Sequence, residues 1–145
     1  MFSVIDIACY FLCLPDENAG DLISNLKLQK LLYYAQGFHL ALYTSKLFQE
    51  DIRAWEHGPV VPDAYHEFKE FGSSAIPAPE VMDFGIFDPE TEELLDEVYA
   101  VYGQFSAWKL RNMTHEESPW KDTSINEVIS PKKMRDYFKT QLASE

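Results

Sequence analysis

Apolar side chains recur at helical spacing over much of the chain. Residues 2 to 13 are apolar nearly all round, which predicts a buried first helix. A longer helix is expected from Ser24, a favoured N-cap residue, to about Tyr43. Two adjacent apolar stripes run along it, so we expect a central helix that packs on more than one side. The stripes are Leu28, Leu32, Ala35, His39 and Leu42, and beside them Leu31, Tyr34, Phe38 and Ala41.

The helical period is lost over residues 46 to 57, where apolar and polar side chains alternate. This alternation predicts a short β-hairpin or ribbon after the second helix. Gly58-Pro59 is expected to end the ribbon, because proline cannot donate to a strand ladder. A third helix then begins near Pro62 and stops at Gly72. The alternating apolar residues are Phe48, Ile52 and Ala54.

The second half of the chain carries three helix-start signals: Asp88-Pro89, Ser106 and Ser130-Pro131. The helix that begins at Asp88 has one apolar stripe. We therefore predict a mainly α fold, a compact helical bundle with a small β-hairpin or ribbon, in a single domain over residues 1–145. The stripe consists of Leu94, Val98, Val101 and Phe105.

The net charge of the chain limits the kinds of partner that it is expected to bind. The 145 residues include 12 Lys and Arg against 24 Asp and Glu, a net charge of −12, and this balance argues against a nucleic-acid binder. A composition of 46% hydrophobic and 14% aromatic residues argues against disorder. Residues 80–97 carry acids and no Lys or Arg, which fits either a solvated face or a docking surface for a basic partner. The acids are Glu80, Asp83, Asp88, Glu90, Glu92, Glu93, Asp96 and Glu97.

The longest apolar run covers residues 7–14, much shorter than the roughly 20 residues that a transmembrane helix needs. No basic segment precedes it, so we expect neither a membrane span nor a secretory signal. Cys9 and Cys13 lie one helical turn apart and are expected to be buried, reduced thiols. The expected location is the cytoplasm.

Motifs for chemistry are missing from the sequence. It has no glycine-rich phosphate loop, no nucleophile elbow and no H-E-x-x-H pair, so we expect no catalytic residue, no metal and no cofactor. Glu56, His57 and Asp63 near the Gly-Pro turn have acid–base side chains. They suggest an alternative, a small hydrolase, which requires one pocket that holds all three together.

Aromatic residues crowd between Tyr33 and Phe71, and Trp and Tyr are frequent anchors of protein interfaces. The turn at Gly58 is expected to place neighbouring side chains on one rim. In contrast, the polar residues of the long helix are expected to stay hydrated. The predicted partner-binding residues are Tyr43, Trp55, Glu56, His57 and Tyr65. The residues expected to be hydrated are Lys27, Gln29, Lys30 and Gln36.

Three segments together resemble the Panacea domain, a SocA/GepA-like, phage-associated antitoxin family. The first is SNLKLQKLLYYAQGFHL at 24–40, and the second is AWEHGPVVP at 54–62, followed by Tyr65 and Phe68. The third is Thr114-His115 followed by Pro119-Trp120. The resemblance extends from residue 4 to about residue 140.

This resemblance implies a mostly helical domain without catalytic residues or cofactors. It implies the antitoxin of a toxin–antitoxin module, which binds a cognate protein toxin and neutralises it. Whether the protein only blocks the toxin or also hands it to a protease system stays open, as does its oligomeric state. A phage-encoded host-interaction protein without a toxin partner is a further alternative.

Overall fold

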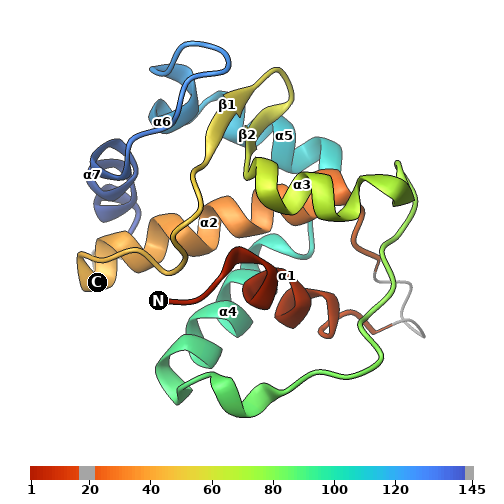
Figure 1. Ribbon diagram of the computed structural model, residues 1–145. Helices are drawn as coiled ribbons and strands as arrows, with labels where there is room; N and C mark the ends of the chain where they lie inside the picture. Colours follow the sequence, from red (N-terminus) through yellow and green to blue (C-terminus); the bar gives the residue numbers. More distant parts are fainter. Residues whose placement is uncertain (17–21, 143–145) are drawn as a thin grey trace.

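The computed structural model describes residues 1–16 and 22–142, and it confirms the mainly α fold (Figure 1). Its two strands form an antiparallel hairpin, placed between the second and third helices, and isolated β-bridges lie outside this hairpin. None of the described helices is both long enough and apolar enough to span a bilayer. The elements are α1 (Val4–Leu12), α2 (Asn25–Tyr43), β1 (Arg53–Trp55), β2 (Gly58–Val60), α3 (Pro62–Phe68), η2 (Lys69–Phe71), η3 (Phe84–Ile86), α4 (Pro89–Tyr102), α5 (Ala107–His115), α6 (Ser118–Lys121) and α7 (Pro131–Gln141).

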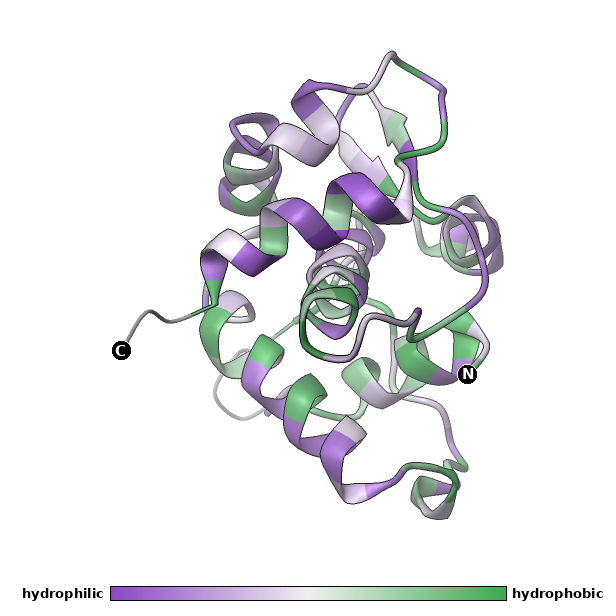
Figure 2. Cartoon of the chain, turned by 90° about the vertical axis from the view of Figure 1, so that its left-hand side faces the viewer, coloured by the Kyte–Doolittle hydropathy of each residue, from purple (hydrophilic) through white to green (hydrophobic). Residues whose placement is uncertain are grey.

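Helix α2 is the axis of the molecule, as its two apolar stripes predict. The Ser24 hydroxyl accepts a hydrogen bond from the Lys27 amide and caps the helix. Helices α1, α3, α4, α5 and α7 and strand β2 all pack against α2. Figure 2 looks along α2 and shows α4 and α7 on different sides of it. Most elements of the described chain are therefore positioned by this one helix.

Four polar residues of α2 were expected to stay hydrated. This expectation was wrong, because all four side chains are buried. Each of the four reaches backbone groups in another part of the chain. The Gln36 amide oxygen accepts from the Leu47 amide at 2.7 Å, and its nitrogen donates to the Phe48 carbonyl at 2.8 Å. Since a buried backbone group without a partner is costly, these side chains attach loops to the core. The four residues are Lys27, Gln29, Lys30 and Gln36.

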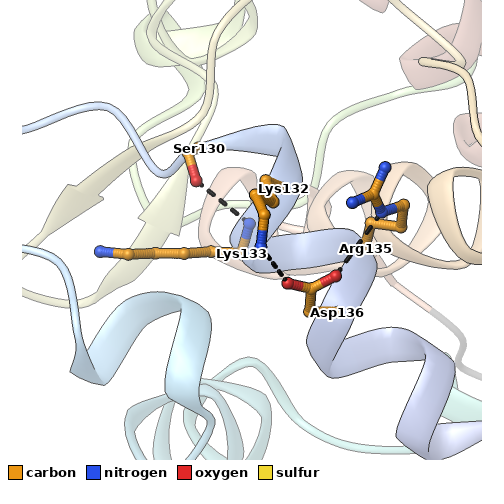
Figure 3. Close-up of polar contacts among 5 residues, drawn as sticks. All are labelled: Ser130, Lys132, Lys133, Arg135 and Asp136. Atoms are coloured by element: carbon orange, nitrogen blue, oxygen red, sulfur yellow. Dashed lines mark hydrogen bonds and ion pairs between the residues drawn. The ribbon is translucent and has the colours of Figure 1, made fainter.

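Gly37 allows α7 to approach α2 closely. A Cβ at this position would overlap the Phe138 ring, which is fully buried on α7. Gly37 therefore serves the close packing of these two helices. Helix α7 begins where Ser130 predicts, with the Ser130 hydroxyl accepting from the Lys133 amide, and its exposed side carries a 2.8 Å ion pair between Lys132 and Asp136 (Figure 3).

The apolar stripe predicted for α4 is covered only in part. Leu94 and Val98 are buried against the rest of the protein, whereas Val101 is 46% exposed. Asp88 stands at the N-cap as predicted, but its carboxylate accepts from the Thr91 hydroxyl and makes no backbone capping bond. One end of the α4 stripe therefore remains open to solvent.

Candidate functional site

The hairpin turns at Glu56 and His57, and Gly58 makes this turn possible. Gly58 has a φ of +109°, a conformation that residues with a side chain rarely adopt. The expectation that Gly58-Pro59 ends the ribbon was wrong, since both residues belong to strand β2. Pro59 pairs with Ala54 across the hairpin.

Proline is tolerated inside this strand because the backbone N–H and C=O groups of its partner, Ala54, point away from β2. The Ala54 amide donates to the Glu127 carbonyl at 3.0 Å, and the Ala54 carbonyl accepts from the Asn126 amide at 2.7 Å. Ala54 thus directs both backbone groups away from β2, and no ladder bond is lost at Pro59. The segment 126–129 completes β1 on its second side.

Side chains from distant parts of the chain hold the hairpin in place. The Lys30 ammonium, fully buried on α2, donates to the Pro59 carbonyl at 3.2 Å. The Trp120 indole nitrogen donates to the Trp55 carbonyl at 2.8 Å, and the Trp120 ring stacks on the His115 ring. Because both attachments come from packed helices, the hairpin tip is presented in a defined position.

Beside the tip lies an open hollow of about 760 Å³, here called the hairpin hollow. The structure brings four of the five predicted partner-binding residues into its lining. Trp55 and Tyr65 meet edge to face with ring centroids 5.2 Å apart. The four residues are Trp55, Glu56, His57 and Tyr65, and the lining also includes Trp108 and Ile125.

Trp108 is absent from the residues predicted from the sequence, although at 56% it is the most exposed large hydrophobic residue that lines the hairpin hollow. The Arg111 guanidinium lies over its ring, 4.4 Å from the centroid, and Arg111 Nε donates to His57 Nδ1 at 3.4 Å. Trp108 follows the Ser106 cap on α5, and no local pattern directs it toward a hairpin 50 residues earlier. Only the packing of α5 against β2 reveals the contact.

Tyr43, the fifth predicted residue, lies elsewhere. It is at the C-terminal end of α2, whereas Asn25 at the opposite end of that helix lines the hairpin hollow. Tyr43 borders a separate hollow of about 250 Å³ with His39 and Glu90, and its ring meets the His39 ring at 4.8 Å. The predicted residues are therefore divided between two faces of the protein.

The acid–base cluster proposed from the sequence is not assembled. Glu56 and His57 line the hairpin hollow, whereas Asp63 is exposed on the first turn of α3 and is not part of the lining. Among residues 1–16 and 22–142, no three His, Cys, Asp or Glu side chains are grouped as a metal site would require. Cys9 and Cys13 are free thiols, but the expectation that they are buried was wrong, because both are only partly buried. This partial burial raises the pKa of each thiol.

A partly buried carboxylate bonded to two tyrosines lies beyond the hairpin. Glu117, just before α6, accepts hydrogen bonds from the Tyr33 hydroxyl at 2.9 Å and from the Tyr34 hydroxyl at 2.8 Å. Burial raises the pKa of Glu117 to about 7, although the two tyrosine bonds act in the opposite direction. This carboxylate links α6 to the middle of α2, and it explains the paired tyrosines of the first resemblance segment as structural residues.

Comparison with known proteins agrees with the resemblance. Residues 28–121 match the family described as "Antitoxin SocA-like, Panacea domain", and the chain belongs to that family. It is similar to Antitoxin SocA of Caulobacter vibrioides (strain NA1000 / CB15N), with 33% identity over 109 residues. That alignment covers 68% of this chain and 58% of the relative, so the chain spans less than two thirds of the relative's length. No solved structure matches the chain.

Proposed function

We propose that this protein is an antitoxin that binds a cognate protein toxin and neutralises it by covering part of the toxin surface. Membership of the SocA-like antitoxin family and the similarity to Antitoxin SocA support this function. We further propose that residues 1–145 act as one domain. In support, the segment 126–129 pairs with β1, and helices from both halves of the chain pack on α2.

We assign the hairpin hollow as the surface that binds the toxin. The main support for this assignment is that three aromatic rings line one open depression. Trp55, Tyr65 and Trp108 line it, and Trp108 stands 56% exposed. Exposed Trp and Tyr rings supply large apolar contact areas at a low cost in side-chain entropy, and such residues dominate binding energies. A stable complex would bury roughly 1,200–2,000 Å² in total, so the hollow would form the centre of a larger contact.

The geometry favours binding over the alternative hydrolase. A hydrolase built on Glu56, His57 and Asp63 needs the three side chains around one substrate position. Two of them line the hairpin hollow and the third does not. We therefore propose a non-enzymatic mechanism, in which no bond of the toxin is made or broken.

The direct test is to express the protein together with the product of the neighbouring gene. We expect the two to elute as one peak in size-exclusion chromatography and growth to be restored when both are produced. A wild-type protein that neither elutes with its neighbour nor restores growth would overturn the antitoxin role and favour a host-interaction protein. Toxin that is blocked but stays abundant indicates simple covering, whereas toxin that disappears indicates delivery to a protease system.

The hairpin hollow is tested by Trp108→Ala, because this ring is exposed and its removal leaves the core intact. Trp55→Ala is a second variant, although Trp55 also packs on Tyr65. Phe84→Ala is the matched control, since Phe84 is 45% exposed and does not line the hollow. We expect Trp108→Ala to weaken toxin binding by about tenfold or more and Phe84→Ala to leave it unchanged. Undiminished rescue by a folded Trp108→Ala variant would remove the hollow from the interface.

A further inference from the structure

A second, smaller depression lies between the C-terminal half of α2, the exposed end of the α4 stripe and the end of α7. This groove has a volume of about 350 Å³ and is here called the α2–α4 groove. In Figure 2 the helices α4 and α7 are seen on either side of the end of α2. Its lining is mostly apolar and includes Phe38, Leu42, Leu94, Val98, Val101 and Leu142.

Two aliphatic side chains remain uncovered at this groove. Leu42 on α2 is 49% exposed and Val101 on α4 is 46% exposed, and both line the same depression. Single exposed apolar residues are ordinary, but these two come from different helices and border the same mostly apolar depression. A groove between helices is the shape that receives the apolar face of another helix.

The charged residues near the groove are acidic on the α4 side and favour a basic partner. Glu97 is the only charged residue among those that line the groove within residues 1–16 and 22–142. Glu90, two turns earlier on the same face of α4, borders the adjoining hollow beside Tyr43. Residues 80–108 contain no Lys or Arg, so the α4 wall presents negative charge alone. Such a rim attracts basic side chains and raises the rate of encounter with them.

The same charges argue against other occupants. A second copy of this chain would bring Glu97 and Glu90 against identical carboxylates if the same faces met. A bilayer surface rich in anionic lipids would repel a protein with a net charge of −12. A helix with apolar residues on one side and Lys or Arg at its flanks satisfies both the apolar floor and the acidic rim.

We propose that the α2–α4 groove docks a basic amphipathic helix of a partner protein, with the partner's apolar residues on Leu42 and Val101 and its Lys or Arg residues at Glu97 and Glu90. The surface is separate from the hairpin hollow. The proposal rests on the proposed function only in that the toxin is the partner we expect to carry this helix. Tyr43, predicted from the sequence as a partner-binding residue, follows Leu42 on α2 and lines the separate hollow that Glu90 borders.

A fluorescently labelled Lys/Leu peptide of about 15 residues, with leucines at helical spacing, probes the groove without any toxin. Its comparator has the same composition in an order that gives no apolar face. We expect the amphipathic peptide to bind the intact protein at least about tenfold more tightly than the comparator, measured by fluorescence anisotropy. Equal affinity for the two peptides would overturn the proposal, because it would reflect net charge alone.

Two matched pairs of variants locate the binding. Glu97→Lys is compared with Glu80→Lys, which makes the same charge change in the loop before α4. Val101→Ser is compared with Val81→Ser, which removes an 89% exposed valine from that loop. We expect each groove variant to weaken peptide binding by about tenfold, and each loop variant to change it by less than about twofold. Equal losses within either pair, or no loss in Val101→Ser, would overturn the proposal.

Self-association is measured in parallel by analytical ultracentrifugation. A wild-type dimer that Val101→Ser abolishes would show that a second copy occupies the groove and would overturn the proposal. Growth rescue is scored separately. Failure of peptide binding with intact rescue would overturn the groove alone, and failure of wild-type rescue with intact peptide binding would overturn the antitoxin role alone.

Discussion

The ammonium group of Lys30 donates a hydrogen bond to the carbonyl oxygen of Pro59, 3.2 Å away, and so joins the N-terminal half of α2 to the second strand of the hairpin. Burial, together with the smaller effect of the nearby Arg111 guanidinium, lowers the pKa of Lys30 to about 7. The position of the hairpin therefore depends on a titratable group that changes charge near neutral pH.

We predict that Lys30 and Glu117 together produce a minimum of folding stability near pH 7. The pKa of Glu117 is raised from 4.5 to about 7, so the unfolded chain loses this proton first and stability falls between these values as pH rises. The pKa of Lys30 is lowered from 10.5 to about 7, so above pH 7 the unfolded chain holds the proton that the folded chain has lost, and stability rises with pH. Each slope approaches about 1.4 kcal/mol per pH unit.

Urea unfolding between pH 4.5 and 9 measures this minimum. Glu117→Gln should flatten the acid side, whereas Glu116→Gln, one residue earlier and exposed, should leave it unchanged. Lys30→Met should flatten the alkaline side, and the exposed Lys69→Met should not. Parallel profiles for Lys30→Met and wild type would contradict the buried charge transition.

We predict that Gln36→Leu destabilises the fold by about 3 kcal/mol or more. The side chain has a similar volume, but the Leu47 amide and both backbone groups of Phe48 lose a buried partner. Gln104→Leu is the control, because Gln104 is exposed and bonds only within its own turn. Chemical denaturation of the two variants side by side provides the measurement, and equal stabilities would exclude Gln36 as the attachment of this loop.

We predict that Gly37→Ala destabilises the protein, although alanine favours a helix by about 1 kcal/mol over glycine. The added methyl group would overlap the Phe138 ring, which is fully buried and edge-packed on Tyr33 and Phe38, and overpacking typically costs about 1–3 kcal/mol. In a Phe138→Leu background the same substitution should cost less. A double-mutant cycle by thermal unfolding measures this coupling, and strict additivity would contradict the contact.

We predict that Gly58→Ala costs about 1–3 kcal/mol and displaces the hairpin tip. Its φ of +109° disfavours a side chain, and the new Cβ would lie 2.8 Å from Lys30 Cε and from Thr114 Oγ1. Gly85→Ala is the control, since Gly85 is exposed and has no positive φ. Thermal unfolding measures the loss of stability, and tryptophan fluorescence reports the displacement of the hairpin tip. A Gly58→Ala protein with wild-type stability would show that the turn relaxes freely.

The sequence alone determined what depends on neighbours along the chain. The serines before residues 25, 107 and 131 each cap a helix, because a hydroxyl needs only the amide three residues later. The width of the apolar surface on α2 correctly predicted a central helix, and the quoted segments predicted the family. Such signals are local, so they can be read without knowing what the helix will meet.

Tertiary structure decided where the polar and charged groups end up. Lys30 and Gln36 have ordinary surface side chains, and only the arrival of β2 and the loop at residues 47–48 gives them buried partners. Pro59 could enter a strand only because Ala54 turns its backbone groups toward residues 126–127. Trp108 reached the hairpin for the same reason, because α5 packs against β2. A contact between segments far apart in sequence leaves no periodic pattern in either segment. The reason is that each polar group finds its hydrogen-bond partner in the other segment and not among its own neighbours.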